Sequence, residues 1–387
     1  MTVHSGNEHS LECGEAGRTG ELADAYYSRG LFDMAADLYR RSIASMREKG
    51  DRRAEAQQRA KLGGAHAAMG QWHLAIESYE QVLVISLEIG DQWMKGVALG
   101  NLGNFYLRLG EVQDAMEYYQ QALGITREVG DRQGEEADLG NLGLAYRDLG
   151  EVQKAIECHE QALAISREIG HRQGERAQLG NLGLAYAALG EAGKAIEYHL
   201  QSLTISREIG DRMEEGADLS NLGSAYAALA DLQKGIDYHE QALIVFREIG
   251  DRGREGNSLG NLGNAYADLG EVQKAIRYYE QALVIAREIG DRRGEGTHLT
   301  NLGETLEEKG ECEQALACYL LGVEIGQAID DPRVAGREAD IQKLKEKLGE
   351  EEFGLLLERV EPNKERIVDE ILRSIAQTAS AGEGEDE

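Results

Sequence analysis

Apolar residues recur along this chain at spacings of three and four, in two stripes that alternate. Within residues 131–170, the first stripe is formed by Leu139, Leu142, Gly143, Tyr146 and Leu149. The second stripe consists of Val152, Ala155, Ile156, His159, Ala162, Leu163 and Ile169. Residues at these spacings share one face of an α-helix, so each unit of the pattern predicts two amphipathic helices, called helix A and helix B below.

Glycines give this pattern a period of 40 residues. One series comprises Gly70, Gly110, Gly150, Gly190, Gly270 and Gly310. A second series comprises Gly50, Gly90, Gly130, Gly170, Gly210, Gly250 and Gly290. Glycine is favoured just beyond the C-terminus of a helix, so two glycines per unit predict two helices and two turns.

A fixed period of this length predicts a stack of repeats in one continuous domain, because each unit contacts mainly its neighbours. We expect a flexible N-terminal segment at 1–18 and an array of about eight 40-residue repeats at 19–330. Capping and extra helices follow at 331–378, and an acidic disordered tail at 379–387. The three expected C-terminal helices span 334–348, 351–360 and 363–377.

The unit resembles the tetratricopeptide repeat. The residues that carry the resemblance are Leu142, Gly143, Tyr146, Ala155, His159 and Ala162, at the family's large and small positions. This unit departs from the family pattern in its length, in His159, which replaces an aromatic residue, and in Arg167, which replaces a proline. The longer unit, with its REIGDR turn and NLG core, is similar to the repeats of LGN/Pins adaptors and kinesin light chains. The resemblance implies an all-α fold, a right-handed α-solenoid of antiparallel helix pairs with C-terminal capping helices.

One position of helix A holds asparagine in six successive units. These residues are Asn101, Asn141, Asn181, Asn221, Asn261 and Asn301. Asparagine is a mediocre helix former, so its recurrence needs a reason beyond helix propensity. At 100° per residue this position lies opposite the core stripe. The resemblance implies that this face lines a concave groove, in which an asparagine ladder binds extended peptides.

A carboxamide suits that role because its donor and its acceptor can bond any peptide backbone. The alternatives are that each amide bonds the next helix, or that duplication copied the residue. The position three residues further on varies between units: Asn104, Leu144, Leu184, Ser224, Asn264 and Glu304. We expect this row to select the ligand, with apolar ligand side chains near the fifth and sixth units and basic ones toward the eighth.

Composition narrows the choice of partner. The chain has 41 basic and 70 acidic residues and a formal net charge of −29, which argues against nucleic acid and anionic membranes as partners. Membrane insertion is not expected, because no apolar run reaches the length of a membrane span. Four cysteines without a CxxC pair and a start without an apolar segment lead us to expect a cytoplasmic protein without disulfides.

Motifs that would indicate catalysis are missing from the sequence. It contains no nucleophile elbow, phosphate loop, zinc-ligand pair or dinucleotide fingerprint, so we expect neither an enzyme nor a bound cofactor or metal. His159, His199 and His239 stand where other units have tyrosine, which identifies them as packing residues rather than metal ligands.

The resulting hypothesis is an interaction scaffold or adaptor that binds an extended or helical partner segment. An alternative is a regulatory or sensor module whose output domain is on a separate chain. We expect a monomer, with self-association through an uncapped end of the array as the other possibility. An LGN/Pins-like regulator of G-protein signalling fits less well, because the faintly similar stretch EEFGLLLERVEPNKER lacks the terminal DQR and contains Pro362.

Overall fold

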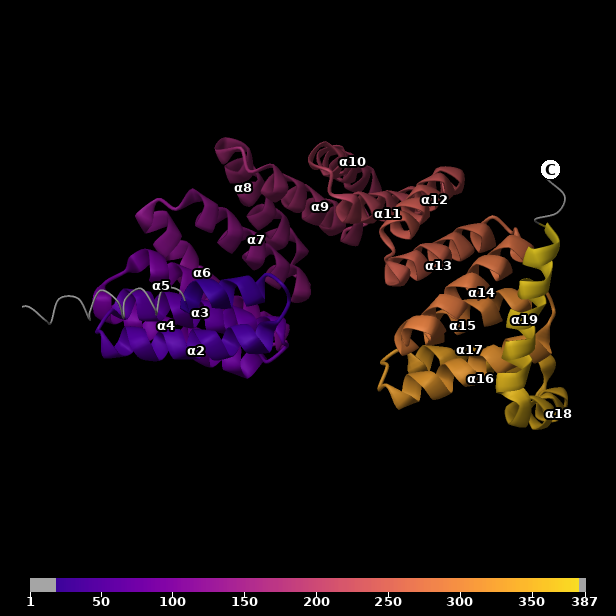
Figure 1. Cartoon of the computed structure of the whole chain (residues 1–387). Helices are drawn as coiled ribbons and strands as arrows, with labels where there is room; N and C mark the ends of the chain where they lie inside the picture. Colours follow the sequence, from indigo (N-terminus) through magenta and orange to yellow (C-terminus); the bar gives the residue numbers. More distant parts are fainter. Residues whose placement is uncertain (1–18, 383–387) are drawn as a thin grey trace, which may run out of the picture. The chain divides into compact units, whose positions relative to one another are not determined.

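The computed structural model describes residues 19–382, with side chains as far as Arg373 (Figure 1). Over this range the chain consists of helices and turns and contains no β-strand, which confirms the all-α prediction. The expected flexible segment 1–18 lies outside the described residues, as does 383–387 of the expected tail.

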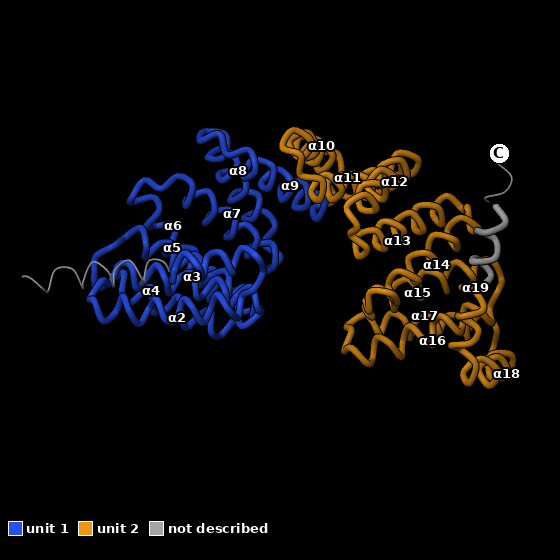
Figure 2. The backbone as a smooth tube through the Cα atoms, viewed as in Figure 1, with its two compact units in different colours: residues 1–189 blue, residues 190–387 orange. Residues whose placement is uncertain are grey.

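The chain divides into two compact units, residues 1–189 and residues 190–387 (Figure 2). The first unit begins with a helix at 19–27 and continues with successive A and B helices. These are α2 (Phe32–Glu48), α3 (Arg52–Ala68), α4 (Trp72–Ile89), α5 (Gln92–Arg108), α6 (Val112–Val129), α7 (Arg132–Asp148), α8 (Val152–Ile169) and α9 (Arg172–Ala188).

The second unit continues the alternation and ends in three further helices. Its repeat helices are α10 (Ala192–Ile209), α11 (Arg212–Ala228), α12 (Leu232–Ile249), α13 (Arg252–Asp268), α14 (Val272–Ile289), α15 (Arg292–Glu308) and α16 (Cys312–Ala328). The C-terminal elements are α17 (Val334–Leu348), α18 (Glu350–Val360), the 3₁₀ turn η1 (Glu361–Asn363) and α19 (Lys364–Gly382).

The helix boundaries follow from the cap residues. Gly130 ends α6 in the left-handed conformation with φ of 71°, where a side chain would be strained. Asp131 then caps α7, because its Oδ1 accepts a hydrogen bond from the Gly134 amide at 2.9 Å. Leu149, placed on the core stripe by its spacing, lies beyond the end of α7 and is partly exposed. The buried stripe is therefore one turn shorter than the sequence pattern indicates.

Helices A and B of one repeat approach closely at a glycine. A Cβ built on Gly143 would lie 2.6 Å from the ring of His159, and one on Gly263 would lie 2.5 Å from Tyr279. The large ring of helix B thus fills the space that the glycine of helix A leaves open, as the alternation of large and small residues predicts. His159 occupies the same packing site as the tyrosines of other repeats.

Neighbouring A helices also meet at a glycine. A Cβ on Gly100 would lie 3.3 Å from Oδ1 of Asp138, and one on Gly140 would lie 2.9 Å from Nε2 of Gln178. At Gly260 the corresponding neighbour is the ring of His298. These glycines therefore accommodate a side chain of the next A helix.

A cluster of two arginines and a glutamate stabilises the turns between repeats. The Glu135 side chain is almost fully buried and accepts hydrogen bonds from Arg127, at 2.8 Å, and from Arg132. Burial raises the pKa of Glu135, but these two hydrogen bonds outweigh it and hold the pKa below its usual value. Arg132 also contacts Glu168 at the end of α8. We call this the Arg–Glu–Arg cluster; its central glutamate recurs as Glu175, Glu215, Glu255 and Glu295.

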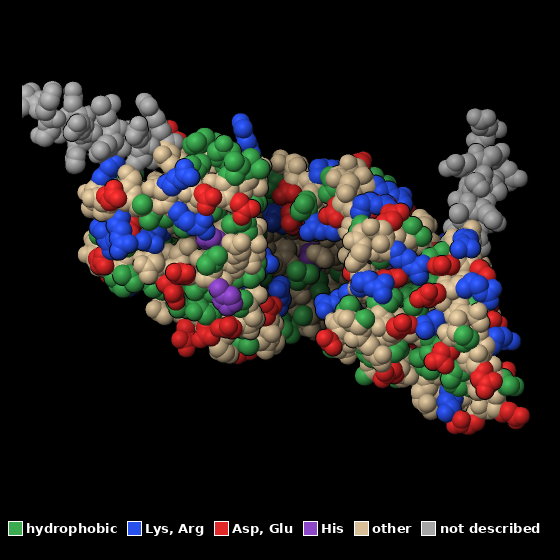
Figure 3. Space-filling model, turned by 60° about the horizontal axis from the view of Figure 1, so that its bottom comes forward, with side chains coloured by type: hydrophobic (Ala, Val, Ile, Leu, Met, Phe, Trp, Pro, Cys, Tyr) green, Lys and Arg blue, Asp and Glu red, His purple; other side chains and the backbone are tan. Residues whose placement is uncertain are grey.

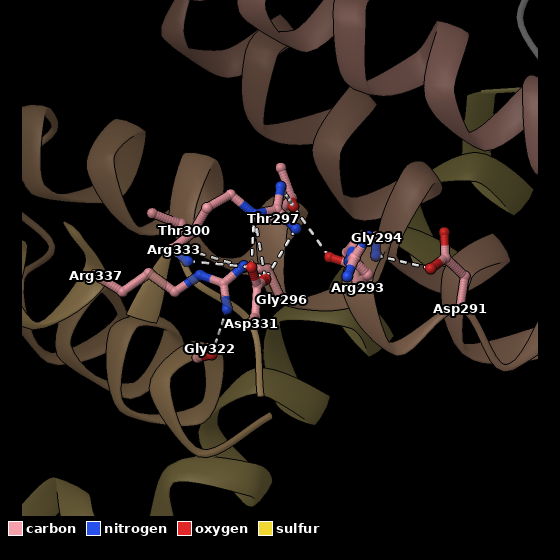
Figure 4. A network of polar contacts seen from close by, with 10 residues as sticks. All are labelled: Asp291, Arg293, Gly294, Gly296, Thr297, Thr300, Gly322, Asp331, Arg333 and Arg337. Carbon is pink, nitrogen blue, oxygen red and sulfur yellow. Dashed lines mark hydrogen bonds and ion pairs between the residues drawn. The ribbon is translucent and has the colours of Figure 1, made fainter. Parts of the chain in front are cut away.

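The helix α17 covers the last repeat through a buried arginine (Figure 4). Arg337 donates to the carbonyl oxygen of Gly322 at 3.0 Å and to Asp331 at 3.1 Å. A Cβ on Gly326 would lie 2.5 Å from its Nη1. Gly322 stands where the fourth repeat has Ala162, so the last pair carries glycines where this cationic side chain crosses it.

The C-terminal helix extends further than expected. It packs on α16 and α14 and ends at Gly382, so the predicted start of a disordered tail at 379 lies inside α19. Ala379 and Ala381 are strong helix formers, and they allow the helix to continue.

Candidate functional site

The recurring asparagines lie on consecutive A helices. Asn101 is on α5, Asn141 on α7 and Asn181 on α9, while Asn221 is on α11, Asn261 on α13 and Asn301 on α15. All six are half-buried. In the first unit α5 contacts α7 and α7 contacts α9, and in the second unit α11, α13 and α15 contact one another in the same order. Each unit therefore carries a row of three asparagines, which we call its asparagine row.

Two of these amides are used within the protein. Asn101 donates to the carbonyl oxygen of Val97 in its own helix at 2.8 Å. Asn301 donates to Oδ1 of Asn264 at 2.9 Å, a bond between neighbouring A helices. For Asn141 and Asn261 the described part of the chain provides no hydrogen-bond partner. The alternative that the amide bonds the next helix thus holds for Asn301, whereas the amides of Asn141 and Asn261 are available to another partner.

The variable row beside the asparagines has an internal partner in some repeats. Tyr119 donates its hydroxyl to Oδ1 of Asn104 at 2.8 Å, and Tyr279 donates to Oδ1 of Asn264 at 2.7 Å. Where helix B carries histidine instead, at 159, 199 and 239, the row holds Leu144, Leu184 and Ser224. Part of the variation in this row therefore follows from the hydroxyl of helix B. Leu184, Ser224 and Glu304 are exposed, and Leu144 is half-buried.

Three of the predicted residues open onto one hollow in the first unit. It lies between α5, α6 and α7 and has a volume of about 180 Å³. Its lining consists of Trp93, Gly96, Val97, Gly100, Asn101, Asn104, Ile125, Thr126, Val129, Asp131, Gly134, Ala137, Asp138 and Asn141. We call it the α5–α7 hollow.

The rim and the interior of this hollow differ in character. Trp93 is 54% exposed, and its indole Nε1 donates to Oδ2 of Asp131 at 3.2 Å. Asp138 is 5% exposed and accepts a hydrogen bond from the Thr126 hydroxyl at 3.1 Å. Burial raises the pKa of Asp138 to about 7. The hollow therefore combines an exposed aromatic ring with a carboxyl group whose charge is only partly compensated.

Trp93 and Asp138 are absent from the sequence-based set of site residues. The sequence does mark Trp93 as unusual, because the same position holds Gln133 and Gln173 in the next two repeats. Asp138 stands at a position that varies between Ala98, Gln178 and Asp218, and its burial is a property of the packed array.

Two of the histidines that replace tyrosine in helix B are packing residues. His199 and His239 are buried, and desolvation lowers the pKa of each to about 4. Among the described residues no group of three or more His, Cys, Asp or Glu side chains is arranged to hold a metal ion. No helix in that part is long and apolar enough to cross a membrane. Acidic and basic side chains alternate over the face shown in Figure 3.

Comparison with family models identifies the repeat. A model described as tetratricopeptide repeat matches six overlapping stretches: 57–128, 94–168, 135–208, 175–248, 216–288 and 254–328. A second model with the same description matches residues 20–53. No curated protein sequence matches the chain.

Solved structures share this architecture at low sequence identity. The apo form of RapI has 18% identity and a TM-score of 0.59, and the match covers 71% of this chain and 99% of RapI. The apo form of the quorum sensor NprR from B. thuringiensis has 13% identity and a TM-score of 0.64, over 80% of this chain and 87% of NprR. A STAND protein with a tetratricopeptide repeat sensor from Pyrococcus horikoshii has 18% identity and a TM-score of 0.65, over 87% of this chain but 50% of its own. At these identities the likeness concerns the fold.

Proposed function

The chain belongs to the tetratricopeptide repeat family, and on that premise we propose that it is a protein-interaction scaffold or adaptor. It binds an extended or helical segment of a partner protein in the groove along its A helices, with the asparagine rows as backbone contacts. The partner carries apolar and basic segments, and the interaction takes place in the cytoplasm.

The observation that carries this proposal is the environment of Asn141. Its amide is half-buried, lines the α5–α7 hollow, and has no hydrogen-bond partner in the described part of the chain. Because this amide makes no hydrogen bond within the described part of the protein, a ligand can bond it without first breaking an internal hydrogen bond. A peptide backbone running along the row would supply both a donor and an acceptor.

A peptide selection tests this proposal. Random-sequence decapeptides displayed on phage are selected against the full chain, and the best binders are synthesised and their Kd values measured. The variant Asn101→Ala/Asn141→Ala/Asn181→Ala removes the row of the first unit. Each lost hydrogen bond contributes about 1 kcal/mol, so we expect the affinity to fall roughly 100-fold.

A matched control is Gln121→Ala, which removes an exposed carboxamide from helix B of the third repeat. This variant should keep the wild-type affinity. Both variants must retain the helical circular dichroism signal and the melting temperature of the wild type. Equal peptide binding by the triple variant and the wild type would refute the role of the row.

A second candidate is a regulatory or sensor module whose output domain is on a separate chain. It is supported by two similar structures, a quorum sensor and a STAND protein with a tetratricopeptide repeat sensor, and this chain covers half of the latter. A sensor changes conformation or partner on binding its ligand, so small-angle scattering with and without a selected peptide separates it from a passive scaffold. The LGN/Pins-like alternative has less support, because its similar stretch forms α18, where Phe353 and Leu356 are buried.

A further inference from the structure

We propose that the α5–α7 hollow is a subsite for one basic side chain, lysine or arginine, of a bound peptide. The inference rests on the proposed function, because it assigns a residue preference to one point of the groove. The aliphatic stem of the basic residue lies against Trp93, Val97 and Ile125, and its cationic head reaches Asp131 and Asp138.

The size of the hollow favours a side chain over a small molecule. Its volume of about 180 Å³ is below the roughly 300–1,000 Å³ of pockets that enclose small-molecule ligands. It is also continuous with the asparagine row, since Asn101 and Asn141 both line it. A peptide backbone bonded to those amides would therefore pass directly over its opening.

Charge selects the kind of side chain. Among the described residues that line the hollow, Asp131 and Asp138 are the charged ones, so the ionisable groups of its lining are acidic. A cation is attracted to two carboxylates and to the face of an indole ring, whereas an acidic side chain would be repelled. Burial raises the pKa of Asp138 to about 7, and a cation beside it would favour its ionised form.

The preceding repeat provides a precedent within the same chain. Asp91 caps α5 as Asp131 caps α7, and Asp91 is paired with the guanidinium of Arg53 at 3.0 Å. Trp93 stands at the position of Arg53 and offers Asp131 a neutral N–H instead. The cation that pairs with the capping aspartate one repeat earlier is thus replaced by an aromatic ring, so the charge of Asp131 is available to a ligand.

Glycines keep the hollow open. A Cβ on Gly134 would lie 2.8 Å from both Oδ2 of Asp131 and the Thr126 methyl group, and one on Gly96 would lie 3.3 Å from Ile125. With Gly100 beside Asp138, three glycines face the groups that would surround the cation.

The test uses peptides selected on the full chain. In each binder every basic residue is replaced in turn by norleucine, which retains an aliphatic stem without the charge, and by glutamate. We expect one position at which lysine or arginine binds at least about tenfold more tightly than norleucine, because bonds to charged groups exceed those between neutral ones. At that position Asp138→Asn should reduce the preference for lysine or arginine, because only Asp131 then attracts the cation, while leaving the norleucine peptide unaffected.

A second variant locates the subsite. Trp93→Gln introduces the residue found at this position in the next repeat and should weaken lysine and norleucine peptides alike, because it removes the wall that both contact. Equal binding of lysine and norleucine peptides, or a preference for glutamate, would overturn the inference. If binding still depended on the asparagine row, the proposed function would stand. Peptide binding that survives loss of the row, or no selection of peptides at all, would overturn both.

Discussion

Gly103 and Tyr119 are in such close contact that a Cβ on the glycine would lie 2.6 Å from Cε1 of the tyrosine ring. Tyr119 is fully buried and donates its hydroxyl to Asn104, so the ring has little freedom to move away. The glycine of helix A and the ring of helix B thus act as one packing unit.

Gly103→Ala should therefore destabilise the protein by about 1–3 kcal/mol, the range for overpacking of a well-packed core. Thermal unfolding followed by circular dichroism measures the effect. Gly124→Ala is the matched control, because a Cβ at that helical position meets nothing within 4 Å. It should stabilise the protein by about 0.5–1 kcal/mol. The same sign for both variants would contradict the packing role of Gly103.

Removing the buried charge of an Arg–Glu–Arg cluster should lower the free energy of unfolding more than removing the charge of Glu168, the exposed contact of the cluster. Glu135→Gln leaves Arg127 and Arg132 without their buried partner, and we expect a loss of about 1–3 kcal/mol in denaturant unfolding. Glu168→Gln changes the exposed contact of Arg132 and should cost at most about 1 kcal/mol. If the two losses were equal, burial of Glu135 would not be the source of its contribution.

The carboxyl of Asp138 should make the protein more stable in mild acid. Its pKa is raised from 3.8 to about 7, so the folded protein binds a proton that the unfolded chain has already released. The stabilisation is complete below about pH 3.8 and is lost as the pH rises to about 7. Asp138→Asn removes this dependence, so its unfolding free energy relative to the wild type should fall by a few kcal/mol from pH 8 to pH 5. A constant difference across that range would show that the carboxyl is ionised when folded.

The buried histidine His239 should make the protein less stable in mild acid, which is the reverse of the effect of Asp138. Desolvation lowers the pKa of His239 to about 4, so below about pH 6.5 the unfolded chain takes up a proton that the folded protein excludes. The stability that depends on neutral His239 is therefore lost as the pH falls from about 6.5 to 4. His239→Tyr, which would pack a tyrosine on Gly223 as Tyr279 packs on Gly263, should lower the pH of the acid unfolding midpoint. His73→Tyr makes the same change at an exposed helix position, so it is the matched control and should leave the midpoint unchanged.

Much of the repeat architecture is predictable from one unit. The positions of Gly143 and His159 imply the close helix pair, and Asp131 with Gly130 implies the turn before α7, because these features depend on residues near in sequence. The end of α19 could not be placed in the same way, since alanines and an acidic tail do not define a sharp helix terminus.

Less of the candidate site can be predicted from the sequence of a single repeat. The face of the asparagines follows from helix geometry, and Asn101, Asn104 and Asn141 share a hollow in the structure. The bond from Tyr119 to Asn104 and the burial of Asp138 could not be read from the period, because they depend on how successive helices are packed. That Trp93 faces the cap of the next repeat is likewise a relation between repeats.

The turn before α5 lacks an Arg–Glu–Arg cluster, since Leu87, Gln92 and Lys95 stand at the positions that Arg127, Arg132 and Glu135 occupy around the turn before α7. The start of α5, which carries Trp93, is thus secured by fewer contacts than the start of α7. Local opening of a protein concentrates where such contacts are few, so amide hydrogens here should exchange faster than those at the start of α7. A basic ligand side chain that lies against Trp93 and reaches Asp131 and Asp138 would add contacts to both helices, so binding and protection of this segment would be thermodynamically linked.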